Sequence, residues 1–150
     1  MQRKLPASVA TAVAALLLVT AIQVAAVVAL GLQQQVGRPQ ALFSAALVVL
    51  LVTGLVRRWR LAWLWGRYLP IFLAIVIAGV LLWSWRSLPP LKLALGLLLF
   101  AVPLGVAGVA LGRPTAFEWF RLVCPECGAR SGRGDLLLRN VRCPRCGDVF

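Results

Sequence analysis

The sequence predicts an all-α integral membrane protein, with about four transmembrane helices in a bundle and a small β-hairpin unit at the C-terminal end. Three observations lead to this fold class. Hydrophobic residues make up 61% of the 150 residues, whereas a soluble domain is about 45–50% apolar. They form long runs, which need lipid as their solvent. All four cysteines and all four carboxylate side chains lie in a polar C-terminal tail that follows the last run.

This uneven composition predicts a transmembrane domain at residues 1–112, a linker at 113–123 and a C-terminal unit at 124–150. The predicted spans are at about residues 8–32, 39–56, 69–85 and 91–111. The first span follows Arg3 and Lys4, as the apolar part of a signal peptide also does. It is longer than the roughly 7–15 apolar residues of a signal peptide, so we expect a retained helix.

Arginine and tryptophan alternate between the second and third runs, at residues 57–68. This interleaving is found in proteins that bind single-stranded nucleic acid. Between two apolar runs, it is more typical of an aromatic belt with basic anchors at the membrane–water interface. We therefore expect these side chains to lie at the level of the lipid headgroups.

Basic residues are distributed asymmetrically around the four predicted spans. One side has 13, in the N-terminus, the segment 57–67 and the tail, and the other side has 3, which are Arg38, Arg86 and Lys92. Cytoplasmic loops of membrane proteins carry the excess of Lys and Arg. The sequence thus predicts a multi-pass protein of the cell inner (cytoplasmic) membrane with both termini in the cytoplasm. Topology also accounts for the net charge of +12.

The apolar runs carry no recognisable catalytic residues. The chain has no His, which excludes Ser-His-Asp triads and His metal sites. We find no paired carboxylates, no nucleophile with a base and no Gly-rich phosphate loop, so we expect neither an enzyme nor an organic cofactor. Gln23 is expected to hydrogen-bond a neighbouring helix, with substrate binding as the alternative. Small residues four apart, such as Ala101 with Gly105 and Gly108 with Gly112, predict close helix packing.

The cysteines have the spacing C-x2-C-x15-C-x2-C, which is the pattern of a four-thiolate zinc site. The candidate metal ligands are Cys124, Cys127, Cys143 and Cys146. Each pair lies in a C-P-x-C-G sequence, and we call residues 124–128 and 143–147 the first and second knuckles. In each, the Pro turns the chain and the Gly tolerates a positive φ. Two disulfides are the alternative, but disulfides are rare in the reducing cytoplasm.

The tail is too short to fold on an apolar core alone. Metal binding would supply the missing free energy, about 10–16 kcal/mol in comparable zinc peptides. Iron also accepts four thiolates, but an iron centre usually has an aromatic shield, and after Cys124 this tail has one aromatic residue, Phe150. The sequence therefore favours Zn²⁺. We expect a turn at Ser131–Asp135 and a strand at Leu136–Arg142.

The end of the chain, V-R-C-P-R-C-G-D-V-F from Val141 to Phe150, resembles the second knuckle of small bacterial zinc-ribbon domains of the C-P-x-C-G type. The resemblance covers Cys124 to Phe150 and implies that all four cysteines bind zinc. Such ribbons are often fused to transmembrane helices, although many have a longer insert between the knuckles. We recognise no family for residues 1–112. The resemblance identifies a module and does not imply an activity.

The function expected from these features is that of a membrane-anchored adaptor or complex subunit, which presents the ribbon to a protein partner at the cytoplasmic face. Alternatives are a small transporter or channel subunit with a regulatory ribbon, or an electron-transfer subunit with rubredoxin-like iron. The ribbon has five arginines against three carboxylates, a modest excess for binding nucleic acid. Attraction to anionic lipid headgroups is the simpler explanation of this charge. No oligomeric state follows from the sequence.

Overall fold

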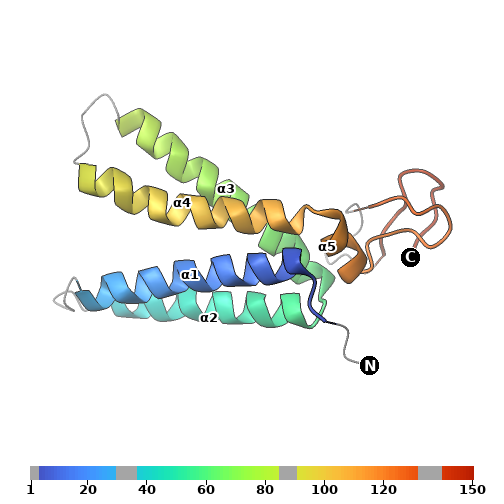
Figure 1. Cartoon of the computed structure of the whole chain (residues 1–150), viewed down its shortest axis with the longest axis horizontal. Coiled ribbons are helices and arrows are strands. Elements are labelled where there is room, and N and C mark those ends of the chain that lie inside the picture. The colour runs from blue at the N-terminus through green and yellow to red at the C-terminus, as the bar shows by residue number, and fades with distance from the viewer. Residues whose placement is uncertain (1–3, 30–36, 85–90, 132–139) are drawn as a thin grey trace.

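The computed structural model of the chain is mostly helical and describes residues 4–29, 37–84, 91–131 and 140–150. Figure 1 shows four long helices and one short helix within these ranges. In chain order they are α1 (Ala7–Ala29), α2 (Gly37–Val56), α3 (Arg60–Ser84), α4 (Leu91–Leu111) and α5 (Pro114–Trp119). Long helices are the expected form of apolar runs, because a helix satisfies its own backbone hydrogen bonds without water.

Three helices are long and apolar enough to cross a membrane, as far as the described residues extend. Their apolar stretches are Ala7–Ala25, Arg60–Trp83 and Ala94–Leu111. In α2, the described apolar stretch is shorter, at Leu42–Val56. These lengths are consistent with a membrane protein.

One helix differs clearly from the apolar run on which its span was predicted. The third begins at Arg60 and not near residue 69, so most of the Arg–Trp segment is helical. The chain turns between α2 and α3 within residues 57–59, where Trp59 N–H donates to the Gly54 carbonyl at 2.8 Å. This tight turn caps α2 and leaves the next residues free to start α3. Residues 30–32 and 85 of the predicted spans lie outside the described residues.

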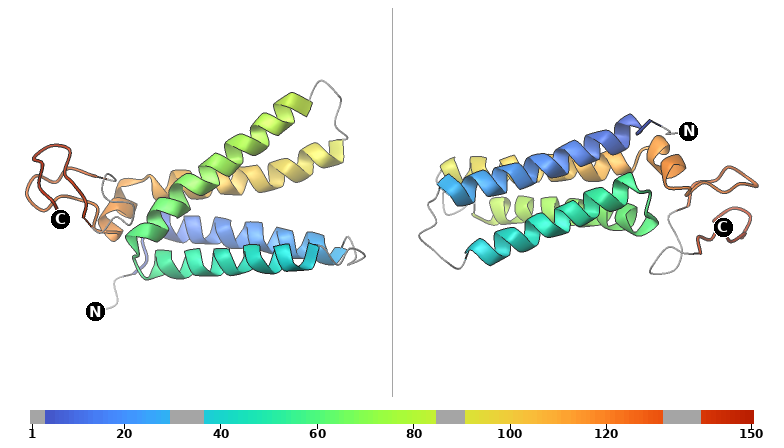
Figure 2. Two further views of the ribbon diagram at one scale, coloured as in Figure 1. Left: turned by 180° about the vertical axis from the view of Figure 1, so that it is seen from behind. Right: turned by 90° about the horizontal axis from the view of Figure 1, so that it is seen from below.

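The long helices pack as two antiparallel pairs, α1 with α2 and α3 with α4, and α4 also packs along α1 (Figures 1 and 2). Toward the end away from the tail, α3 diverges from α1 and α2. The buried core lies at the opposite end of the bundle, next to the tail. Its members include Val9, Leu16, Leu55, Trp63, Leu111 and Phe120.

The predicted hydrogen bond between helices is present, and the predicted small-residue packing is present at Gly108 but not at Gly105. Ser44 Oγ on α2 donates a hydrogen bond to Gln23 Oε1 on α1 at 3.3 Å, which confirms the expected interhelical bond. Gly108 on α4 lies so close to α3 that an added Cβ would be 2.9 Å from the Arg67 carbonyl oxygen. Gly105, in contrast, has open space where its Cβ would be.

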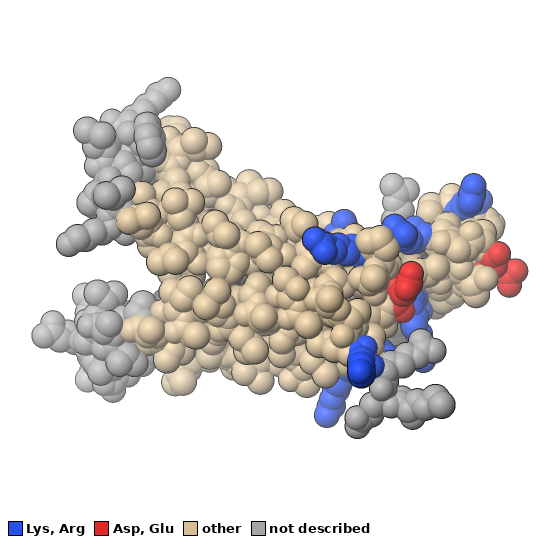
Figure 3. All heavy atoms as spheres, viewed as in Figure 1, with Lys and Arg blue, Asp and Glu red and all other residues tan. Residues whose placement is uncertain are grey.

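The start of α1, the turn between α2 and α3, and the cysteine tail lie at the same end of the bundle (Figure 1). Lys and Arg side chains gather over this end in the space-filling view (Figure 3). The three basic segments grouped together by the sequence are therefore neighbours in space.

Candidate metal centre

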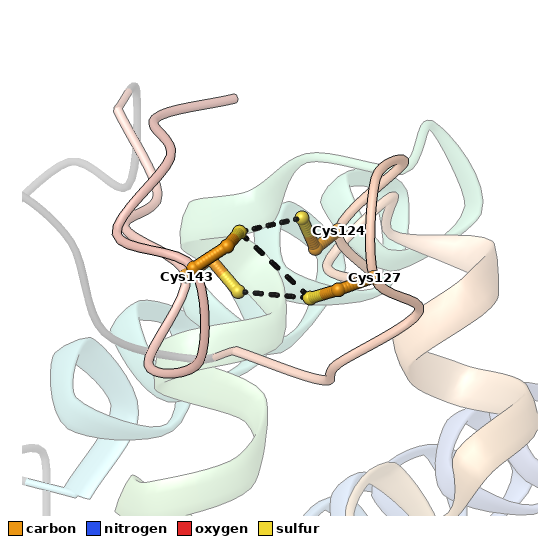
Figure 4. A group of neighbouring side chains, drawn as sticks. Cys124, Cys127 and Cys143 are labelled. Carbon is orange, nitrogen blue, oxygen red and sulfur yellow. Dashed lines mark hydrogen bonds between the residues drawn. The ribbon is translucent and has the colours of Figure 1, made fainter.

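The four cysteine sulfurs form one cluster, in which all of the sulfur atoms lie within 4.8 Å of one another. Figure 4 shows the side chains of Cys124, Cys127 and Cys143 pointing toward one another from the two knuckles. The Sγ–Sγ distances are 3.4 Å for Cys127–Cys143, 3.6 Å for Cys124–Cys146 and 3.8 Å for Cys127–Cys146. A tetrahedral zinc with Zn–S bonds of about 2.3 Å separates its sulfurs by about 3.8 Å. The four thiols therefore fit a metal ion of this size.

The first knuckle holds its cysteines by a tight backbone turn. Gly128 N–H donates to the Cys124 carbonyl at 3.0 Å, and Cys124 N–H donates to the Ala129 carbonyl at 2.9 Å. Gly128 has φ of +67°, which glycine adopts without the penalty that a side chain would cause. This turn places the side chains of Cys124 and Cys127 on the same side.

The second knuckle repeats this turn. Gly147 N–H donates to the Cys143 carbonyl at 3.1 Å, and Cys143 N–H donates to the Asp148 carbonyl at 2.7 Å. Gly147 has φ of +81°. The positive φ predicted for the glycine of each knuckle is thus confirmed, and two equivalent turns supply two sulfurs each.

Backbone N–H groups lower the thiol pKa values and burial raises them, whereas contacts between the sulfurs act in both directions. The N–H groups of Cys146 and Arg145 point at the Cys143 sulfur and lower its pKa to about 6, despite burial. At Cys146, the N–H of Asp148 lowers the pKa, but the neighbouring Cys143 sulfur and burial outweigh it and raise the pKa to about 12.

The pKa of Cys127 is also raised, because the Cys143 sulfur and burial outweigh the lowering effect of the Ala129 N–H. Four thiolates cannot all be charged at this separation without a cation, since like charges disfavour ionisation. A metal ion removes that repulsion and displaces the remaining protons. The cluster thus has the electrostatic character of a cation site.

Backbone pairing closes each half of the tail around its own knuckle, but no strand forms among the described residues of the tail. There are two isolated antiparallel bridges, Val123 with Arg130 and Arg142 with Val149. Ser131 connects the halves, since its Oγ donates to the Arg142 carbonyl at 2.6 Å. Most of the predicted turn and strand lies at residues 132–139, outside the described residues. The β-hairpin therefore stays a prediction.

The segment predicted as a linker is packed against the bundle. It contains α5, and its residues Phe120 and Leu122 are buried in the same core as Val141 of the tail. Arg60 at the start of α3 donates to two main-chain oxygens, those of Phe150 at 3.3 Å and Arg121 at 3.1 Å. The residues that flank the cysteine cluster are consequently in direct contact with the helices.

Two tryptophans form much of this attachment, and the predicted aromatic belt is wrong for one of them. Trp63 is fully buried, and its indole N–H donates to the Leu111 carbonyl at 2.9 Å. Trp119 donates to the Leu55 carbonyl at 3.2 Å. Sequence reasoning missed Trp63 because alternation with arginine suggested an exposed ring. Gly66, one turn later, allows the close approach of Leu111, but nothing in the local sequence indicates that contact.

Comparison with known proteins returned no matching family model, no matching curated protein and no matching solved structure. The resemblance of residues 124–150 to bacterial zinc ribbons therefore stays a prediction that no family match supports. Function has to be inferred from the cysteine cluster and its surroundings.

Proposed function

We propose that the chain is a membrane-anchored adaptor or complex subunit, which presents a structural zinc ribbon at the cytoplasmic face of the inner membrane. The observation that carries this proposal is the four-sulfur cluster packed on one end of an apolar helical bundle. Four protein ligands close a tetrahedral site and leave no position for water or substrate. The metal would then hold the tail's shape without taking part in a reaction.

In this proposal Cys124, Cys127, Cys143 and Cys146 hold one zinc ion, and the bundle crosses the membrane four times. In addition to the three helices with long apolar stretches, α2 would cross the membrane. The aliphatic stems of Arg57 and Arg58 would extend its apolar stretch at one end. Both termini are cytoplasmic, on the side with the larger number of basic residues.

The docking surface proposed for a protein partner is the outer side of the second knuckle. Residues 144–149 are all exposed, and Val149 leaves 60% of its surface accessible. Contiguous exposed apolar patches with a polar rim mark interaction sites, and Val149 would form part of such a patch. Arg145 and Asp148 would supply the polar rim.

Metal analysis of the full-length protein, purified in detergent, tests the first half of the proposal. We expect one zinc per chain, and its loss in Cys127→Ser and Cys146→Ser. Arg145→Gln, which lies between the second pair of cysteines, is the control and should keep its zinc.

Stoichiometric iron with a charge-transfer colour would contradict the structural role and favour electron transfer. Four thiols that resist alkylation after stringent chelation would indicate disulfides and exclude a metal site.

Crosslinking in intact membranes tests the second half. A protein crosslinked to the wild type should be lost in both Cys146→Ser and Val149→Glu, and retained in Val80→Ala, which changes an exposed side chain of α3. A crosslinked protein that persists in both tail variants would mean that the ribbon does not dock it.

A further inference from the structure

A polar hollow of about 520 Å³ lies beside the α2–α3 turn and α5, separate from the cysteine cluster. Its charged lining residues are the basic Lys4, Arg58 and Arg121 and the acidic Glu118. Pro6, Thr115 and Trp119 complete the lining. Basic side chains around a concave surface form a ready site for an anion.

Arg58 reaches the hollow from an unusual backbone position. It follows the end of α2, where its N–H donates to the Leu55 carbonyl at 3.3 Å and the next N–H, of Trp59, donates to Gly54 at 2.8 Å. This pair of bonds is the Schellman motif, whose left-handed residue is usually glycine. Here that residue is an arginine with φ of +63°.

Arg121 occupies the same position at the end of α5. Its N–H donates to the Glu118 carbonyl at 3.2 Å, the Leu122 N–H donates to Phe117 at 2.8 Å, and its φ is +55°. Among the described residues, Arg58 and Arg121 are the non-glycine residues with positive φ. A side chain is disfavoured in this conformation, and strained residues of this kind concentrate at functional sites. Both strained arginines line one hollow.

The hollow is held together across the two motifs. The Arg58 guanidinium carbon lies 3.9 Å from the centre of the Trp119 ring, and the Arg121 carbonyl accepts a hydrogen bond from Arg60. The hydroxyl groups of Thr115 and Ser8 form a hydrogen bond, with 2.8 Å between their oxygen atoms. The positions of the two arginines are thus fixed by neighbours other than a ligand.

The depth of the hollow indicates the kind of anion. Lys4 comes just before α1 begins at Ala7, and Arg58 comes just after α2 ends at Val56. The hollow is therefore level with the ends of the apolar helices, where the headgroups of a bilayer lie. Anionic lipid phosphates are the abundant anions at that level.

We propose that this hollow binds the headgroup phosphate of an anionic phospholipid. Lys4, Arg58 and Arg121 provide the N–H donors, because charged donors form the strongest hydrogen bonds to phosphate oxygens. Glu118 reduces the local positive charge and disfavours a second anion. The site uses none of the ribbon arginines and does not depend on the proposed adaptor function.

The test compares two double variants of the full-length protein by native mass spectrometry in detergent, with added phosphatidylglycerol or phosphatidylcholine. Arg58→Gly/Arg121→Gly removes both charges but installs the residue that each turn favours, so the protein should stay folded. Arg142→Gln/Arg145→Gln removes the same charge from exposed ribbon positions and is the matched control.

We expect phosphatidylglycerol to bind more tightly than phosphatidylcholine to the wild type and to the ribbon variant. In the hollow variant, its affinity should fall by about fivefold for each arginine removed. Equal binding of both lipids to the wild type, or a loss confined to the ribbon variant, would overturn the proposal. Competition by inorganic phosphate at the concentration of the lipid would assign the hollow to a soluble anion instead.

Discussion

Trp63 shows how one residue connects three parts of the chain. Trp63 belongs to α3, and its indole N–H donates to the carbonyl of Leu111, the last residue of α4. Its ring packs edge-on against the Phe117 ring of α5, with 5.2 Å between the ring centroids. The Leu111 carbonyl lies in the last turn of its helix and lacks a helical partner. Trp63 therefore satisfies a buried polar group as well as filling space.

Replacing Trp63 by Phe should keep most of the apolar contact but leave the Leu111 carbonyl without this donor. An unsatisfied buried acceptor costs about 1–3 kcal/mol, so thermal unfolding in detergent should occur at a lower temperature. Trp83→Phe is the control, because Trp83 is 86% exposed and should change little. Equal stability of the two variants would show that the indole hydrogen bond is not important.

The cysteine cluster was accessible to sequence reasoning, whereas the role of Trp63 was not. A knuckle is a local structure, in which the spacing of Cys124, Cys127 and Gly128 nearly determines the turn. Trp63 is buried only because α4 and α5 end beside it, and this arrangement depends on contacts far apart in the sequence. The same limit applies to Arg60, whose hydrogen-bond acceptors lie at residues 121 and 150.

At the scale of elements, the contact between α3 and α4 depends on Gly108. A Cβ at this position would overlap Ile71 and approach the Arg67 carbonyl to 2.9 Å. Close approach of backbones through small residues is the main way in which membrane helices associate. The sequence pattern predicted small-residue packing but could not say which of the four-residue pairs faces a neighbour.

Gly108→Ala should destabilise the bundle by about 1–3 kcal/mol through overpacking. Gly105→Ala adds the same methyl group where nothing lies within 4 Å, so its stability should be close to that of the wild type. Chemical unfolding in mixed micelles measures both. The packing assignment would be refuted by a larger loss in Gly105→Ala.

The pair α1–α2 includes a hydrogen bond between Ser44 and Gln23. Side-chain bonds of this kind in membranes average about 0.6 kcal/mol. Gln23→Leu should therefore insert and fold, with a small decrease in unfolding free energy. Loss of a measured transport activity in this variant, with folding intact, would favour the transporter alternative over the adaptor.

For the whole molecule, the order of the helices could be predicted from the sequence because each apolar run makes one helix and each helix reverses the chain. Because the chain reverses at each helix, the start of α1, the α2–α3 turn and the tail lie at one end, as Figure 1 shows. The divergence of α3 from α1 and α2 could not be predicted, since no charge or turn residue encodes it.

Reporter fusions at residues 1 and 150 should both be active in the cytoplasm, because this end carries the excess of basic residues. A fusion within residues 85–90, between α3 and α4, is the internal control and should be active only outside. A C-terminal reporter active only outside would contradict the proposed orientation and, with it, the preference for zinc over disulfides.

The attachment of the tail through Arg60, Trp63 and Trp119 sets an order for biosynthesis. Both knuckles leave the ribosome after every long helix, and the tail residues Trp119, Arg121 and Phe150 near them hydrogen-bond to residues of α2 and α3. In the proposed topology, the helices are therefore delivered to the lipid before the tail has a surface to fold against. When metal is scarce, cells should accumulate inserted chains with protease-sensitive tails, and a later supply of metal should complete them without new translation.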